Sequence, residues 1–136
     1  MRILVDTNVV FDVYEHRQPH YAAGNQLFQR VHRKDLAAAV ATHTLANGFY
    51  LYRRPFVAFV QKRLLNDFEV CGPDAYLTGV CLRLGMPDLE DALQVGAALA
   101  WKASFIVTRN VKHFRLSTIP ALTPAGFLHR FFRQTR

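Results

Sequence analysis

The chain has 136 residues, of which 51% are apolar, and this is enough to bury one hydrophobic core, so we expect a single domain over residues 1–136. No run of about 20 apolar residues occurs, and Asp6 interrupts the apolar N-terminus, which argues against membrane insertion or export and favours a cytoplasmic protein. The formal net charge of +7 favours an anionic partner. Cys71 and Cys81 lie in apolar surroundings and lack the spacing of zinc ligands.

The positive charge is unevenly distributed along the chain. No Asp or Glu follows Asp91, so the C-terminal third is purely cationic. A nucleic acid or an acidic protein segment would be attracted to this part, whereas the alternative is a solvated basic surface that only improves solubility. The cationic residues after Asp91 are Lys102, Arg109, Lys112, Arg115, Arg130, Arg133 and Arg136.

Four short apolar runs predict buried strands, at residues 2–5, 37–41, 68–71 and 105–107. A segment with helical spacing of its apolar residues separates each run from the next. Strands that alternate with helices predict an α/β protein in which helices cover a mostly parallel sheet. The sequence has no internal repeat, low-complexity segment or linker, which agrees with a single domain.

Prolines mark several helix boundaries. An apolar helical face runs through residues 45–52 until Pro55 interrupts it, and a further helix is expected from near Pro55 to about residue 66. We expect Pro73 in the first turn of another helix, where a missing N–H costs little. The pair Thr123-Pro124 predicts one more helix start, with Thr123 as the cap.

The segment 86–100 predicts a long helix with an acidic start. Asp88 is a plausible N-cap, Glu90 and Asp91 follow it in the first turn, and the body of the helix is rich in Ala and Gly. Such small residues would allow close packing against the sheet. The carboxylates have an ordinary explanation here, because negative charge stabilises a helix N-terminus.

Asp6 is the strongest single candidate for chemistry. It directly follows a buried strand, and ligands of open parallel sheets bind outside the carboxyl ends of the strands. Asp91 can approach the same edge, together with Asp88 or Glu90, and Mg2+ is the usual remedy for carboxylates that converge without cationic partners. The alternative is a turn that ends the strand, in which Asp6 accepts backbone hydrogen bonds.

Four segments together resemble the PIN-domain family, in the order in which that family has them. They cover essentially the whole chain, and the closest likeness is to the VapC-like branch, the toxins of bacterial toxin-antitoxin pairs. The segments are residues 3–10 (ILVDTNVV), 87–94 (PDLEDALQ), 106–114 (IVTRNVKHF) and 119–128 (IPALTPAGFL).

The resemblance implies a three-layer α/β/α sandwich around a central sheet, and a pocket that binds Mg2+ or Mn2+ and hydrolyses RNA phosphodiester bonds. Asp6 and Asp91 match the metal-binding carboxylates. Thr108 and Asn110 match the motif after the fourth strand that lines the pocket, and Asn110 is expected as a further metal ligand. Thr7 and Asn8 match the hydroxyl and amide that support Asp6.

The resemblance implies three partners, which are RNA, a cognate antitoxin and a second copy of the chain. The aromatic tail is either a dimer surface or packed on its own sheet. It consists of Phe127, Phe131 and Phe132.

Two positions depart from the family pattern. Asn47 occupies the helix position where many PIN domains have Glu, and as a neutral ligand it would lower the charge available to a cation. His113 stands before Phe114, where related sequences often have Asp. These departures motivate a second interpretation, in which the metal site is depleted and the chain binds RNA or an antitoxin without cleaving RNA.

The expected mechanism is metal-assisted phosphodiester hydrolysis. Asp6 and Asp91 would hold the metal, and Asp88 or Glu90 would orient a second water or metal. We expect the substrate backbone to contact polar and cationic residues that follow the strands at 2–5 and 105–107. These residues are Asn8, Thr108, Arg109, Asn110 and Lys112. A receiver-like or flavodoxin-like signalling domain is a weaker alternative, because no Gly-rich phosphate loop is present.

Overall fold

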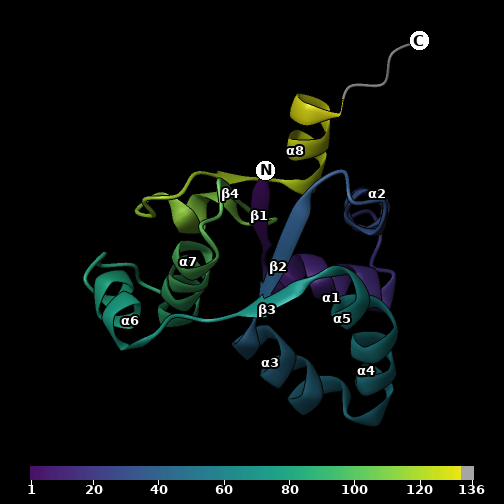
Figure 1. Ribbon diagram of the computed structural model, residues 1–136, viewed down its shortest axis with the longest axis horizontal. Coiled ribbons are helices and arrows are strands. Elements are labelled where there is room, and N and C mark those ends of the chain that lie inside the picture. The colour runs from purple at the N-terminus through teal and green to yellow at the C-terminus, as the bar shows by residue number, and fades with distance from the viewer. Residues whose placement is uncertain (133–136) are drawn as a thin grey trace.

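A computed structural model describes residues 1–132, and its centre is a five-stranded sheet. The strand order is β3-β2-β1-β4-β5 and every neighbouring pair is parallel (Figure 1). The strands are β1 (Arg2–Val5), β2 (Ala37–Ala41), β3 (Glu69–Cys71), β4 (Phe105–Val107) and β5 (Ala121–Leu122). The prediction of a parallel α/β sheet is therefore confirmed. Arg133 and Arg136, counted above among the C-terminal cations, lie outside the described residues.

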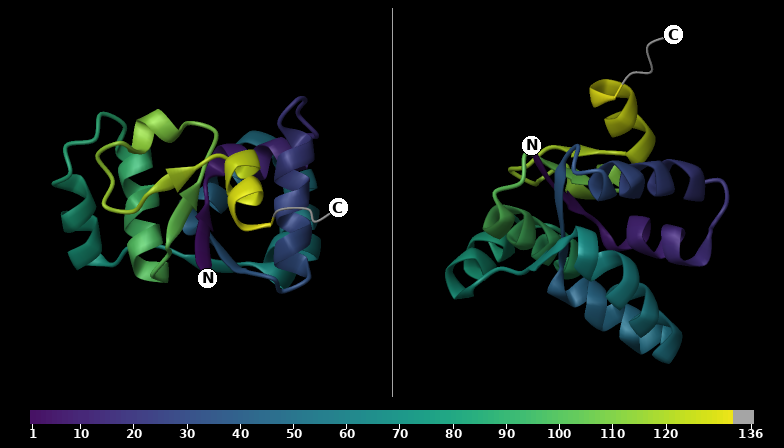
Figure 2. Two further views of the ribbon diagram at one scale, coloured as in Figure 1. Left: turned by 90° about the horizontal axis from the view of Figure 1, so that it is seen from above. Right: turned by 45° about the vertical axis from the view of Figure 1, so that its right-hand side comes forward.

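Helices cover both faces of the sheet and complete the three layers. In the view from above, α6 and α7 lie on one side and α2 on the other (Figure 2). The helices are α1 (Thr7–Glu15), α2 (Tyr21–His32), α3 (Thr42–Tyr52), α4 (Arg54–Phe59), the π-helical η1 (Val60–Leu64), α5 (Leu65–Asp67), α6 (Ala75–Leu82), α7 (Leu89–Trp101), the 3-10 helix η2 (Val111–Phe114) and α8 (Pro124–Phe131).

Alternation along the strands divides the apolar residues between two cores. In β1, Ile3 and Val5 join a core with α1, α2, α4 and α8, whereas Leu4 points to the other face and packs with α7. β1 and β2 are buried on both faces, and this explains why they appear in the sequence as continuous apolar runs rather than as alternating ones.

The long helix packs against the sheet through its alanines, which share a core with Leu4, Ala39 and Ala41, whereas Gly96 faces the connection after β3 and α6. A Cβ placed there would lie 2.9 Å from the ring of Pro73 and 3.2 Å from Cys81 Sγ, so only glycine allows α7 to approach the chain after β3 this closely. This contact also explains why the prediction for Pro73 was wrong. Pro73 packs in the connection against α7, and the helix begins later, with Asp74 as a cap that accepts a hydrogen bond from the Leu77 N–H.

Other boundaries agree with the sequence. Thr123 caps α8 by accepting from the Gly126 N–H, with Pro124 at the first helical position. The helical stretch after Pro55 continues to Asp67, with a π-helical turn in its middle. Cys71 and Cys81 are free thiols. Among the described residues, no helix is long and apolar enough to cross a membrane.

The aromatic tail packs on its own sheet. Phe127 is fully buried, and its ring centroid lies 6.1 Å from that of Phe105 on β4 and 4.9 Å from that of Phe131. Phe127 is therefore unavailable to a dimer surface, whereas Phe131 and Phe132 are only partly buried. The most exposed aromatic residues lie elsewhere, on α3 and α6, where Tyr50 and Tyr76 are more than 70% exposed.

Candidate acidic site at the switch point of the sheet

The strand order reverses direction between β1 and β4, and this switch point is where open α/β sheets bind ligands. The two strands end side by side, with Val5 paired to Val107. The next residue on each chain segment is polar: Asp6 after β1 and Thr108 after β4. Both are buried, so the topology brings a carboxylate and a hydroxyl from opposite ends of the sequence into one place.

Asp6 is held by hydrogen bonds to each of its carboxylate oxygens. Oδ1 accepts from the Thr7 N–H at 2.8 Å, which makes Asp6 the cap of α1, and Oδ2 accepts from Thr108 Oγ1 at 2.7 Å. Burial nevertheless raises the pKa of Asp6 to about 6, against the lowering effect of these hydrogen bonds. The negative charges of Asp91 and Glu90 add to the increase, so the three carboxylates interact electrostatically.

Thr108 links the segment after β4 to the segment after β1 through hydrogen bonds. While its hydroxyl donates to Asp6, the same oxygen accepts from the Asn110 N–H at 3.0 Å and from Asn8 Nδ2 at 3.3 Å. Asn8 Oδ1 in turn accepts from the Arg109 N–H at 3.3 Å. The predicted residues Asn8, Thr108 and Asn110 are therefore brought together, but Asn110 takes part through its backbone and its side chain is exposed.

The acidic start of α7 supplies the second carboxylate. Asp88 caps the helix, because its Oδ1 accepts from the N–H groups of Glu90 at 2.8 Å and Asp91 at 3.2 Å. The ordinary explanation for Asp88 is thus confirmed. Partial burial, followed by the charge of Asp88, raises the pKa of Asp91. His113 Nδ1 lies 3.4 Å from Asp91 Oδ2 and opposes this shift.

The two positions that depart from the family pattern both contact this cluster. Asn47 Nδ2 donates to Glu90 Oε1 at 2.9 Å, so the neutral residue on α3 reaches an acidic residue of α7. His113, on η2, contacts Asp91. Each departure therefore places a potential donor next to a carboxylate, where an acidic residue would have added a further negative charge.

A buried polar network that the sequence analysis missed lies behind Asp6. Thr7 Oγ1 and Thr44 Oγ1 are 2.6 Å apart, and Gln94 Nε2 donates to them at 2.9 and 3.2 Å. Gln94 is fully buried and its Oε1 has no hydrogen-bond partner. A polar residue three positions after Asp91, in an otherwise apolar helix, was the available signal, because residues three apart share a helix face.

Arg109 has a different partner from the predicted one. Its Nε lies 2.7 Å from Oδ2 of Asp12, a carboxylate whose side chain is 2% exposed, and Arg17 Nη1 lies 3.7 Å from the other oxygen. The sequence analysis did not single out Asp12. Since the guanidinium compensates a buried charge, the ion pair ties the segment after β4 to α1.

A cavity of about 560 Å³ opens beside Asp91. Its lining combines the carboxylates of Asp88 and Asp91 with the cationic side chains of Lys112, a predicted substrate contact, and Arg115, which the sequence analysis named only among the C-terminal cations. Pro87 and Leu116 supply apolar surface. The cavity therefore offers both signs of charge and some apolar surface next to Asp91.

The residues present fit a divalent cation in an open site. Within residues 1–132, no three Asp, Glu, His or Cys side chains converge to form a metal cage. Mg2+, however, is usually bound by one or two carboxylates, with water and phosphate oxygens completing the coordination. Asp6 and Asp91 could supply two such carboxylates, and their raised pKa values mean that a nearby positive charge would stabilise both ionised forms.

This protein is thus an α/β protein with a parallel sheet and carboxylates at the switch point of that sheet. Comparisons with known proteins identify its family. The sequence profile of the PIN domain family matches residues 2–112. No curated protein sequence gives a significant match. Because the profile covers most of the chain, this protein belongs to the PIN domain family.

Solved structures of similar fold come from toxin-antitoxin complexes. VapBC2 from Rickettsia felis, bound to a promoter DNA fragment, has a TM-score of 0.65 and 20% identity, and the alignment covers 90% of this chain and 98% of that chain. FitAcB from Neisseria gonorrhoeae has a TM-score of 0.64 and 14% identity, with 90% and 98% covered. VapBC-1 from nontypeable Haemophilus influenzae has a TM-score of 0.65 and 17% identity, with 92% and 99% covered. At these identities the likeness is one of fold.

Proposed function

We propose that this chain is a metal-dependent endoribonuclease that hydrolyses RNA phosphodiester bonds. The observation that carries the proposal is the pair of carboxylates Asp6 and Asp91 at the switch point of the sheet, where both have a raised pKa and the charge of Asp91 contributes to the raised pKa of Asp6. Burying a carboxylate to this extent costs stability, and a function that needs the charge explains why it is there.

Asp6 and Asp91 would hold Mg2+ or Mn2+. When bound, such an ion lowers the pKa of water and stabilises negative charge on phosphate oxygens. Thr108 and the Thr7 N–H keep the Asp6 carboxylate in one orientation, while Asp88 fixes the first turn of α7 and hence Asp91. Glu90 accepts a hydrogen bond from Asn47 and would orient a water molecule next to Asp6 and Asp91. Asn110, whose side chain is exposed, would complete the pocket on the substrate side.

Lys112 and Arg115 would bind the RNA backbone in the cavity beside Asp91. Such contacts position the substrate by charge and carry no base information. Arg109 would contribute less than predicted from the sequence, because its guanidinium pairs with Asp12. Its backbone N–H instead holds Asn8, which keeps the wall of the pocket in place.

The physiological role we propose is that of the toxin in a cytoplasmic toxin-antitoxin pair, acting as one domain. The support is the family together with the folds of the complexes named above. The partner would be a separate antitoxin chain. A homodimer would use α3 rather than the aromatic tail, because Phe49, Tyr50 and Leu51 expose between 40% and 71% of their surface there.

The direct test is cleavage of mixed-sequence single-stranded RNA by the purified protein in Mg2+, Mn2+ or EDTA. Cleavage that requires metal and is lost in Asp6→Asn and Asp91→Asn, with unchanged folding by circular dichroism, is the expected result. Asp35→Asn is the matched control, because Asp35 is a surface carboxylate that pairs with Arg30 away from the pocket. Cleavage that persists in both pocket variants would refute the assignment.

The contacts of Asn47 and His113 favour a second candidate function, in which the chain binds RNA or an antitoxin without cleaving RNA. This candidate predicts weak metal affinity and RNA binding that falls steeply with salt. Asn47→Glu and His113→Asp restore the acidic residues, so a gain of metal-dependent cleavage in the double variant over an inactive parent would establish it. Full activity in the parent chain would exclude it.

A further inference from the structure

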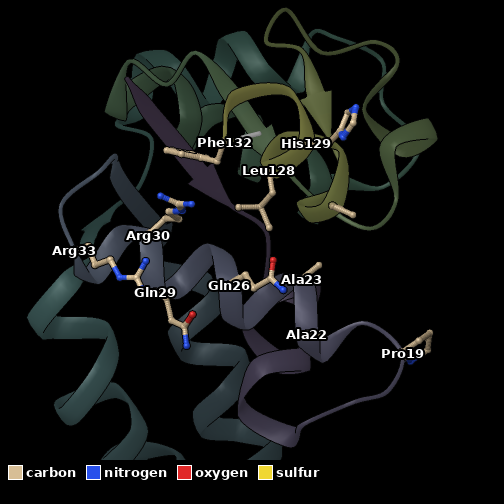
Figure 3. A pocket seen from close by; sticks show the side chains of 11 residues that line it. Pro19, Ala22, Ala23, Gln26, Gln29, Arg30, Arg33, Leu128, His129 and Phe132 are labelled. Carbon is tan, nitrogen blue, oxygen red and sulfur yellow. The ribbon is translucent and has the colours of Figure 1, made fainter. Parts of the chain in front are cut away.

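A groove lies between α2 and α8, and none of its lining residues belongs to the acidic site. Its volume is about 800 Å³. One wall is a stripe along residues 19–33, spaced by three and four positions, and the other is formed by Ala125, Leu128, His129 and Phe132 (Figure 3). The groove shares no lining residue with the cavity beside Asp91, so a ligand could occupy it without contacting the carboxylates.

Small and apolar side chains line part of the groove, next to the amides of Gln26 and Gln29. Ala22 and Ala23 face it from α2, Ala125 from α8, and Leu128 extends from α8 towards Gln26 and Ala23 (Figure 3). Small side chains allow the backbone of a ligand to approach closely, and two helices with stripes that face one groove can receive the apolar face of a third. A peptide helix therefore fits the shape of this surface.

Charge restricts the chemistry of that peptide. Arg30, Arg33 and His129 line the groove, and no Asp or Glu of the described chain does so. Arg30 is partly neutralised by Asp35, whose Oδ2 lies 3.1 Å from its Nη1. An ordinary explanation for basic residues here is that cations in the last turn of α2 stabilise that helix. This explanation accounts for their position near the helix end, but it does not account for the lack of carboxylates in the described lining of the groove.

The groove is less suited to RNA. Single-stranded nucleic acid is usually bound by aromatic faces on which bases stack. Phe132 is the aromatic residue of the groove lining, and the guanidinium of Arg30 covers its ring, with Cζ 4.6 Å from the centroid. Arg30 therefore competes with a base for stacking on Phe132.

We propose that the groove between α2 and α8 binds an acidic amphipathic helix of a partner protein. Its apolar face would pack on Ala22, Ala23 and Leu128, and its carboxylates would face Arg33 and His129. This inference concerns a surface outside the acidic site and is independent of the nuclease proposal.

The test uses two synthetic helical peptides labelled with fluorescein. Both carry Leu at alternating intervals of three and four residues, and the remaining positions are mainly Glu in one peptide and Gln in the other. We expect the acidic peptide to bind at least about tenfold more tightly in fluorescence anisotropy, with an advantage that shrinks as salt is added. Equal binding of both peptides, or no binding of the acidic one, would overturn the proposal.

Variants locate the binding. Ala22 is exposed, so Ala22→Trp fills the groove with little effect on folding, and Arg33→Glu reverses its charge. Each should weaken binding of the acidic peptide by about tenfold or more. Lys62→Glu is the matched charge reversal, because Lys62 is an exposed residue of η1 that does not line the groove, and it should leave binding unchanged.

Two further measurements distinguish peptide binding in the groove from nuclease activity and from RNA binding. The Asp6→Asn variant should bind the acidic peptide as the parent does, even if the nuclease proposal fails. Mixed-sequence single-stranded RNA should bind Arg33→Glu as it binds Lys62→Glu. If RNA binding instead falls selectively in Arg33→Glu, while peptide binding is unaffected by the groove variants, the groove is a nucleic-acid surface and the peptide proposal is wrong.

Discussion

The carboxylate of Asp6 has two functions that oppose each other energetically. As the cap of α1 it accepts a backbone hydrogen bond, which stabilises the helix start. As a buried charge at the switch point it destabilises the fold whenever it is ionised, because the site is nearly inaccessible to water. Asn would keep a hydrogen-bond acceptor for the cap and remove the charge. The two functions can therefore be separated by one substitution.

At the scale of this residue we predict that Asp6→Asn makes the protein more stable at neutral pH. The pKa of Asp6 is raised from 3.8 to about 6, so the folded state binds the proton more tightly than the unfolded state. Stability is therefore lost as pH rises from about 4 to 6, and the loss is complete above that range, at about 3 kcal/mol. In urea titrations with EDTA, the variant should exceed the parent by about that amount at pH 7.5 and by much less at pH 4.

The control for this prediction is Asp35→Asn, which removes a surface carboxylate paired with Arg30 and should be neutral or slightly destabilising near neutral pH. An Asp6→Asn variant that is less stable than the parent at pH 7.5 would contradict the prediction, since it would mean that the hydrogen bonds of the carboxylate outweigh the cost of burying its charge.

Between elements, the ion pair of Asp12 and Arg109 joins α1 to the segment after β4. Removing Arg109 leaves the buried Asp12 carboxylate with only Arg17, which lies 3.7 Å from Oδ1, to compensate its charge. This is costly, but the Arg109 side chain is 30% exposed and water screens part of the effect. We predict that Arg109→Met lowers the free energy of unfolding by about 2 kcal/mol in urea titrations. The double variant Asp12→Asn/Arg109→Met should recover much of this loss.

This cycle distinguishes a structural role of Arg109 from RNA binding. If Arg109 mainly binds RNA, the single variant will be as stable as the parent and its affinity for RNA will fall. If it mainly anchors the segment after β4, stability falls and is recovered in the double variant. Lys112→Met, next to the cavity, is the matched control, and it should weaken RNA binding with little effect on stability.

The contact between α3 and α4 depends on a glycine. A Cβ at Gly48 would lie 2.1 Å from Cε2 of Phe56, a fully buried ring that cannot move freely. We predict that Gly48→Ala destabilises the protein by at least about 2 kcal/mol in thermal or urea unfolding. Gly79→Ala is the matched control in α6, where the new methyl group meets only the flexible Arg83 guanidinium at 3.3 Å, and it should stabilise by about 0.5–1 kcal/mol.

At the scale of the whole molecule, the fold brings two carboxylates from distant parts of the chain close enough to interact electrostatically. Asp6 lies between β1 and α1, Asp91 lies in the first turn of α7, and the cavity lining includes Asp91 but not Asp6. A cation that binds both should therefore stabilise the complete fold rather than one element. Its effect should also depend on pH, because a protonated carboxylate does not bind a hard cation.

We predict that Mn2+ or Mg2+ raises the melting temperature of the parent chain at pH 8 and has little effect at pH 5. The increase follows the mass-action stabilisation of any ligand that binds only the folded state, about 2.7 kcal/mol at a hundred times its Kd. Differential scanning calorimetry with stepwise addition of metal measures it, and EDTA should reverse it. Asp6→Asn should abolish the increase, whereas an increase of the same size in that variant would place the metal elsewhere.

Much of the fold follows from local patterns. Parallel strands buried on both faces need uninterrupted apolar residues, so β1, β2 and β4 stand out in the sequence at their observed bounds. Asp88 and Thr123 cap helices as predicted, because capping depends on residues only two or three positions apart. Pro73 gave a wrong prediction for the same reason, since its ring is used in a tertiary contact with Gly96 that local rules do not include.

The sequence by itself therefore determined the class of fold, the strand end that carries Asp6 and the acidic start of the helix that carries Asp91. Only the tertiary structure decided what these residues contact. The Asp12–Arg109 ion pair, the Thr7, Thr44 and Gln94 network and the groove between α2 and α8 all join residues far apart in the chain. Their partners are chosen by strand order and helix packing, and an isolated local pattern holds no information about either.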